Sequence, residues 1–293
     1  MIYYCLSFLF TLTGKYSQVK FGRSVKNIFD LFIFSLITGC IASVFFFIMS
    51  GFCIRINPAT FVYSLIFSLI VLTSHFLNLL LFRAVDVSTA TVLTSTLTLV
   101  ISFITGTLFL SEKTGFFELL RGVVMVTASL LLYFPVKKGE SVKNRFNAKG
   151  IVISLVLSCS GVSASVISNL FSKDPKVTDS NSFFFLTNIF VVVFAVGAVF
   201  IIKKSSLFLL LRELKSFSAK GYALIGISTV SSNVCSLMQI LIFASGDGIT
   251  LYTPISGALG LVAAAIIALI EKEKPKFLPL ALACVSLFIG LLQ

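Results

Sequence analysis

Charged residues are scarce in this chain. Asp, Glu, Lys and Arg make up 12% of its 293 residues, about half the share found in a soluble domain. Hydrophobic residues make up 57%, and the mean hydropathy is +1.07. No polar segment is long enough to form a soluble domain. We therefore expect an all-α integral membrane protein, because helices satisfy their own backbone hydrogen bonds in lipid.

Metal-ligand and disulfide patterns are also missing. The six cysteines are scattered without a CxxC pair, and His75 is the only histidine. We therefore expect no disulfide framework, no metal site and no cofactor. An enzyme would need acids, bases or metal ligands that converge at one face. None is evident, so an integral membrane enzyme is the least favoured function. The net charge of +12 does not indicate nucleic-acid binding, because the basic clusters lie in loops between apolar runs.

Apolar runs long enough to cross a bilayer fill most of the chain. A spanning helix needs roughly 20 apolar residues. Because the chain is apolar from its first residues, we expect a retained first helix in place of a cleaved signal. Ten segments fit: 1–18, 30–52, 59–82, 87–110, 115–135, 150–171, 182–202, 221–243, 248–270 and 277–292.

The second half of the sequence resembles the first at an offset of 161 residues. Asp86 and Glu112 bound an uncharged run, and Asp247 and Glu273 bound another at this offset. The same offset aligns Asn78 with Gln239. A basic linker, 137–149, separates a first five-helix repeat (1–136) from a second (150–293). We expect Asp86 and Asp247 to be N-caps that accept backbone N–H bonds.

The distribution of basic residues predicts an orientation. Odd-numbered loops carry 18 of the 23 Lys and Arg residues, which places these loops in the cytoplasm and both termini outside. Loops that are equivalent in the two repeats carry opposite bias. Five helices per repeat would invert the second copy, and inverted repeats are typical of secondary transporters with a site near the bilayer midplane.

Two helix-plus-hinge segments carry a resemblance to a known family. They are TLTLVISFITGTLFLSEKTGFF, which ends at Phe117, and TPISGALGLVAAAIIALIEKEKPKFL, which ends at Leu278. Each is similar to the fourth or ninth helix of ten-helix EamA-type permeases of the drug/metabolite transporter superfamily. The resemblance implies ten transmembrane helices, arranged as two inverted five-helix repeats around a central cavity. It also implies alternating access for small metabolites. Relatives of this kind usually keep both termini in the cytoplasm, whereas the charge count here predicts the opposite.

Small polar residues inside the predicted spans are the candidate substrate contacts. In the fourth span, hydroxyls recur at steps of four and three residues and share one helix face. Such residues also let membrane helices approach and hydrogen-bond one another, so packing is the alternative. The candidates are Lys15, Ser74, His75, Asn78, Thr91, Ser95, Thr98, Ser165, Asn169, Asn233, Ser236, Gln239, Thr253 and Ser256.

Two of these candidates are titratable. His75 either carries a proton or contacts substrate, or it is held by a neighbouring helix. Lys15 either binds an anion or snorkels from the end of the first helix. No Asp or Glu lies in the middle of a span. The resemblance then disfavours exchange of organic cations for protons, because relatives with that activity rely on a buried carboxylate.

The favoured function is a secondary transporter that moves a neutral, zwitterionic or anionic small metabolite by alternating access, with export as one direction considered. A flippase for a lipid-linked substrate is the alternative. The expected partners are a small-molecule substrate and the lipid bilayer. We expect a monomer or homodimer in the bacterial inner (plasma) membrane.

Overall fold

A computed structural model describes residues 2–25, 28–110, 148–177, 179–203, 218–246 and 249–272, together with a few isolated positions in 115–127 and 281–285. These residues form eight helices and no strand. The helices are α1 (Ile2–Ser24), α2 (Ile28–Met49), α3 (Pro58–Ala84), α4 (Val87–Phe109), α6 (Ala148–Lys173), α7 (Ser180–Lys203), α9 (Ala219–Ala244) and α10 (Ile249–Ile270).

The eight helices coincide with eight of the ten predicted spans. The other two, 115–135 and 277–292, and most of the linker 137–149 lie outside the described residues. Six described segments are long and apolar enough to cross a membrane: Asp30–Met49, Pro58–Ala84, Thr89–Phe109, Lys149–Lys173, Ser180–Ile201 and Ala219–Ala244. The chain is therefore an all-α, multi-pass membrane protein.

Local sequence fixes where several helices begin. Asn57 caps α3 by accepting a bond from the Thr60 N–H at 2.7 Å, and Pro58 occupies the first turn, where no N–H is needed. Ser218 caps α9 through the Gly221 N–H at 3.1 Å. Asp86 is the N-cap residue of α4, as predicted, but its side chain makes no capping bond. The expected carboxylate cap is therefore wrong, and Asp247 lies outside the described residues.

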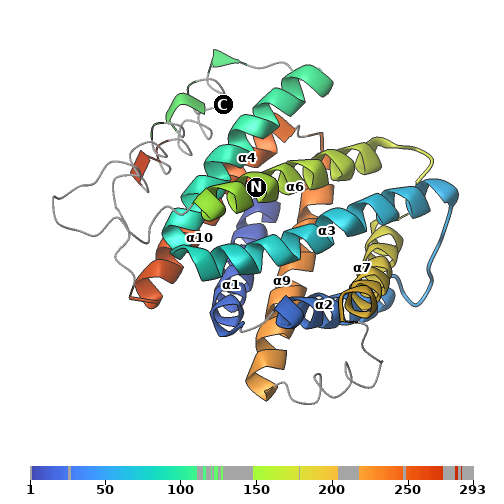
Figure 1. Cartoon of the computed structure of the whole chain (residues 1–293). Helices are drawn as coiled ribbons and strands as arrows, with labels where there is room; N and C mark the ends of the chain where they lie inside the picture. The colour runs from blue at the N-terminus through green and yellow to red at the C-terminus, as the bar shows by residue number, and fades with distance from the viewer. Residues whose placement is uncertain are drawn as a thin grey trace.

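Every described helix makes its most extensive contacts with a helix from the other half of the sequence. The four pairs are α1 with α9, α2 with α7, α3 with α6, and α4 with α10. Figure 1 shows α3 and α6 crossing the view in front of α1 and α9, with α2 and α7 seen nearly end-on. The two halves are thus interleaved, and they do not pack as two separate bundles.

Most of the contacts keep the same pattern when helices are exchanged in order between the halves. Each helix of the first half has a counterpart in the second: α6 for α1, α7 for α2, α9 for α3 and α10 for α4. When both helices of the α1–α9 contact are replaced by their counterparts, the result is the α6–α3 contact. The same replacement turns α2–α9 into α7–α3 and α1–α10 into α6–α4, all of which are present. The arrangement therefore has an approximate two-fold character.

Exchanged helices also run in opposite directions. Val19 near the end of α1 shares an apolar cluster with Ile153 near the start of α6. Phe46 at the end of α2 stacks on Phe184 at the start of α7, with ring centroids 4.9 Å apart. Leu79 at the end of α3 likewise joins Ile225 at the start of α9.

α4 and α10 follow the same rule, since the early Ala90 clusters with the late Ala264.

The predicted basic loops share one end of the molecule, here called the basic end. Two apolar clusters lie there, and they join residues beside the first, third, fifth, seventh and ninth predicted loops. A third cluster, Phe46, Phe67, Phe171, Phe183, Phe184 and Ile240, lies at the opposite end. This confirms that the described flanks of the basic loops lie together, while their side of the membrane stays a prediction.

Candidate functional site

Two glycines bring helices from the two halves into close contact. A Cβ atom built on Gly14 of α1 would lie 2.9 Å from Cβ of Ser231 in α9. One built on Gly39 of α2 would lie 2.7 Å from Cγ2 of Val192 in α7. Real Cβ atoms essentially never come this close to other atoms. Small residues of this kind let membrane helices pack backbone to backbone.

Four helices that carry predicted site residues contact one another in a closed series. α1 contacts α9, α9 contacts α6, α6 contacts α10, and α10 contacts α1, while α1–α6 and α9–α10 are not among the substantial contacts of the described helices. We call this arrangement the four-helix ring. It contains helices from both halves of the sequence, and the predicted site residues on it come from all four of them.

Hydrogen bonds between polar side chains tie the ring together. Gln18 of α1 donates from Nε2 to Ser232 Oγ of α9 at 3.4 Å. Gln239 of α9 donates from Nε2 to Ser165 Oγ of α6 at 2.9 Å. The second bond unites two of the predicted site residues. The α1–α9 seam is further bonded between the hydroxyls of Thr13 and Ser231 at 3.0 Å.

Lys15 does not snorkel to the end of its helix. α1 continues to Ser24, more than two turns beyond Lys15. The ammonium donates to the backbone oxygen of Gly260 in α10 at 3.4 Å. The side chain is surrounded by protein, and it is half-buried by its exposed surface area. The expectation that it snorkels at a helix end is therefore wrong.

His75 and Tyr252 share this combination of depth and residual exposure. Both side chains are surrounded by protein atoms, and part of the surface of each is still exposed. The imidazole of His75 meets the ring of Phe34 edge-on, with centroids 5.6 Å apart. Its buried Nδ1 has no hydrogen-bond partner among the residues that the structure describes. Tyr252 packs against Tyr4 and Phe243, and it hydrogen-bonds to Ser256.

The remaining candidates on α3, α6 and α9 fall into two groups. Asn233 and Ser236 bond within their own helix, to the carbonyl oxygens of Thr229 at 2.8 Å and Ser232 at 3.1 Å. These bonds favour the packing interpretation for both residues. In contrast, Asn169 is buried with an unpartnered Oδ1 in the described part of the chain. Ser74 and Asn78 are half-buried.

The hydroxyls of α4 and α10 line the contact between these two helices. Ser95 lies beside Gly257, whose Cβ position is 3.9 Å from Cβ of Ser95. Thr91 and Thr253 are buried, and their hydroxyls have no partner among the described residues. Thr98 and Ser256 are half-buried. The predicted stripe therefore contains both buried and partly exposed positions.

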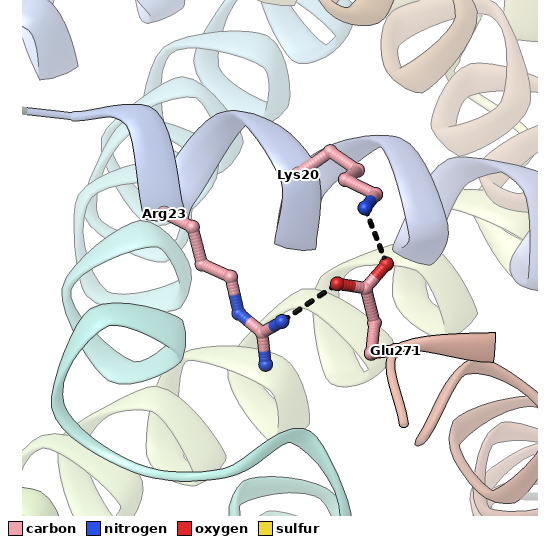
Figure 2. A network of polar contacts seen from close by, with 3 residues as sticks. All are labelled: Lys20, Arg23 and Glu271. Carbon is pink, nitrogen blue, oxygen red and sulfur yellow. Dashed lines mark hydrogen bonds and ion pairs between the residues drawn. The ribbon is translucent and has the colours of Figure 1, made fainter. Parts of the chain in front are cut away.

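An ion-pair network that sequence reasoning missed closes the basic end of the α1–α10 seam. Glu271, just beyond α10, accepts from Lys20 Nζ and Arg23 Nη1 of α1, each at 2.7 Å (Figure 2). The carboxylate is 7% exposed, whereas the two basic side chains are 40% and 37% exposed. The hydrogen bond to Glu271 raises the pKa of Lys20, which lies beyond the apolar run of α1.

The repeat offset does not reproduce this network in the other half. Position 271 aligns with position 110, which is a leucine. An apolar side chain cannot form the equivalent ion pair, so the two ends of the molecule differ in charge chemistry. The sequence repeat indicated Glu273 as the boundary acid of this segment, whereas the residue that forms the ion pairs is Glu271, two positions earlier.

Comparisons with known proteins bear on the fold alone. No protein-family model matches the chain, and no curated protein matches it. Chains of solved structures do match it. One of them, described only as the crystal structure of a protein, aligns with a TM-score of 0.64 and 12% identity over 99% of this chain and 93% of that one. The architecture therefore occurs in an experimentally determined structure over nearly its full length.

Proposed function

We propose that this protein is a secondary transporter that moves a small metabolite across a membrane by alternating access. The observation that carries the proposal is the two-fold exchange of helix contacts, in which each exchanged helix runs opposite to its counterpart. Such an arrangement can open to either side of the bilayer by similar motions, which is the logic of inverted-repeat transporters. The deep but only half-buried Lys15 and Tyr252 support an interior that admits polar solutes.

We further propose that the chain is a ten-helix EamA-type permease with two inverted five-helix repeats and a central cavity. The sequence resemblance supports this assignment, as does the agreement of eight predicted spans with the eight described helices. The substrate is a neutral, zwitterionic or anionic molecule, because the chain has no carboxylate in the middle of a span. The basic end faces the cytoplasm in this proposal.

The moving parts in this proposal differ from the sequence halves. Because the most extensive contacts join helices of different halves, rocking one half against the other would separate well-packed pairs. The α1–α9 pair and the α3–α6 pair are exchanged with each other by the two-fold pattern. We propose that these two pairs tilt relative to each other, while α2–α7 and α4–α10 act as the pivots between them.

Transport can be tested without knowing the substrate. Purified protein in liposomes is incubated with a pool of small polar metabolites, and mass spectrometry then identifies compounds that accumulate inside. Protein-dependent uptake of a small set of compounds is expected, and protein-free liposomes are the control. A parallel arm measures movement of fluorescent lipids between leaflets. Lipid movement without metabolite uptake would replace the transporter with the flippase alternative, and neither activity would refute both.

A further inference from the structure

Within the four-helix ring, Lys15 is a cation with too few partners. An ammonium group has three N–H donors. In the part of the chain that the structure describes, Lys15 has one acceptor, the Gly260 oxygen, at the long distance of 3.4 Å. Lys20 and Arg23, by contrast, both pair with Glu271. The positive charge of Lys15 is therefore not balanced by a described carboxylate.

The position of Lys15 makes this shortage costly. A charged group surrounded by protein is expensive unless it is paired. At the basic end, Lys20 and Arg23 of the same helix form ion pairs with Glu271, so the chain provides a carboxylate where an ion pair serves the structure. A fixed acid near Lys15 would remove the cost permanently. No carboxylate among the described residues pairs with Lys15, which leaves room for a mobile anion.

The surroundings of Lys15 suit an anionic group. Gly260 opposite it has no side chain, and even a Cβ there would lie 3.7 Å from Nζ. On the α10 face, Ser256 lies one turn before Gly260, and its half-buried hydroxyl hydrogen-bonds to Tyr252. On α1, Gln18 lies one turn after Lys15 and is also half-buried. Hydroxyl and amide groups beside an ammonium can donate to oxyanions.

We propose that the Lys15 ammonium binds the anionic group of the transported molecule, a carboxylate or a phosphate, between α1 and α10. This inference rests on the proposed transport function and narrows its substrate class to anions. The anion accepts hydrogen bonds from the Lys15 N–H groups that the Gly260 oxygen does not use, and it balances the positive charge of Lys15.

Thermal unfolding of the purified full-length chain tests this binding site. The probes are succinate and acetate for carboxylates, glycerol 3-phosphate for phosphates, glycerol as the neutral match and putrescine as the cation, all at constant ionic strength. At least one anion should raise the Tm of the wild type by a few degrees with saturation, because a ligand that binds the folded state stabilises it. The carboxylate and phosphate arms then identify the preferred group.

Variants separate a binding role from a structural one. Lys15→Gln should abolish the anion-dependent rise, Lys15→Arg should keep part of it, and the exposed Lys220→Gln should keep all of it. Without ligand, Lys15→Gln should unfold at a higher temperature than the wild type, because it removes an unbalanced interior charge. A lower temperature would assign Lys15 a structural role and overturn the proposal.

The other outcomes are also decisive. The proposed site would be overturned if an anion raised the Tm of Lys15→Gln as much as that of the wild type. It would also be overturned if only glycerol or putrescine raised the Tm, or if no anion raised it. Metabolite uptake that Lys15→Gln leaves unchanged would refute this inference and leave transport intact. Lys15-dependent anion binding without uptake of any compound would support the site and refute transport.

Discussion

The close approach of α2 and α7 gives the sharpest test of the interleaved fold. In Gly39→Ala, the new Cβ would lie 2.7 Å from Cγ2 of Val192 and 3.0 Å from the backbone oxygen of Asn188. The valine side chain is stiff at χ1, and the backbone oxygen cannot move without the helix. The two helices must therefore separate by several tenths of an ångström, and overpacking of this kind costs about 1–3 kcal/mol.

A second glycine in the same helix pair serves as the matched control. Gly197 of α7 has no atom within 4 Å of its Cβ position. Both substitutions replace glycine by alanine inside a helix, so the helix-propensity gain of up to about 1 kcal/mol is common to both. The difference between the two variants isolates the packing cost. Gly39→Ala should therefore be about 1–3 kcal/mol less stable than Gly197→Ala.

The assay is SDS-induced unfolding of the purified protein, followed by circular dichroism. Val192→Ala removes the nearest clashing atom, so it should recover part of the loss when combined with Gly39→Ala. Contacting residues typically show coupling of about 0.5–3 kcal/mol in such a cycle. Equal stability of Gly39→Ala and Gly197→Ala, with no coupling to Val192, would show that α2 and α7 do not meet as described.

Five further predictions concern the ion pairs and their pH dependence, the polar ring, the histidine and the orientation. Glu271→Gln should lower the Tm more than Lys20→Met, because it removes the carboxylate that both ion pairs share, whereas Lys20→Met leaves the Arg23 pair in place; equal shifts would contradict this. The pKa of Lys20 is raised in the folded protein, so the ion pair of Lys20 with Glu271 contributes to stability at every pH below the ordinary lysine pKa of about 10.4. This contribution is lost as the pH rises through the higher pKa of the folded state. The Tm difference between wild type and Lys20→Met should therefore stay constant from neutral to mildly alkaline pH, and a decline already near neutrality would refute it. Gln239→Leu should lower the free energy of unfolding by about 1–3 kcal/mol, because it leaves the Ser165 hydroxyl without its α9 partner; unchanged SDS unfolding would contradict the bond. His75→Phe should leave the pH profile of transport unchanged, because the ring packs against Phe34, whereas a profile flattened near neutrality would make His75 the proton carrier. A periplasmic reporter fused after Gln293 should be active, and a silent reporter would reverse the predicted orientation.

Hydrophobicity and charge were sufficient to predict the membrane class and the shared end of the basic loops. Apolar runs predict membrane spans because a spanning helix is defined by its length and apolar composition, and these do not depend on which helix it packs against. The third predicted span, 59–82, lies within α3 (Pro58–Ala84). The positions of basic residues likewise depend on local sequence alone, so the loops could be grouped before any contact was known.

Contacts between helices could not be predicted in the same way. Lys15 was expected near a helix end because the apolar run stops there. In the structure α1 continues to Ser24, and Gln18 finds a partner in Ser232 of α9. The role of Glu271 depends on α1 reaching it at the basic end. For His75 the decisive neighbour is Phe34 of α2, which sequence spacing does not reveal.

Alternating access itself is tested most directly by labelling one interior position from each side of the membrane. In a cysteine-free background, Ser256→Cys is placed in proteoliposomes and exposed to an impermeant thiol reagent outside or inside, with the fully buried Ala264→Cys as control. Transport by alternating access predicts that the cysteine at position 256 reacts from each side separately, while the one at 264 reacts from neither. Labelling of position 256 from one side alone, or from neither, would contradict the account.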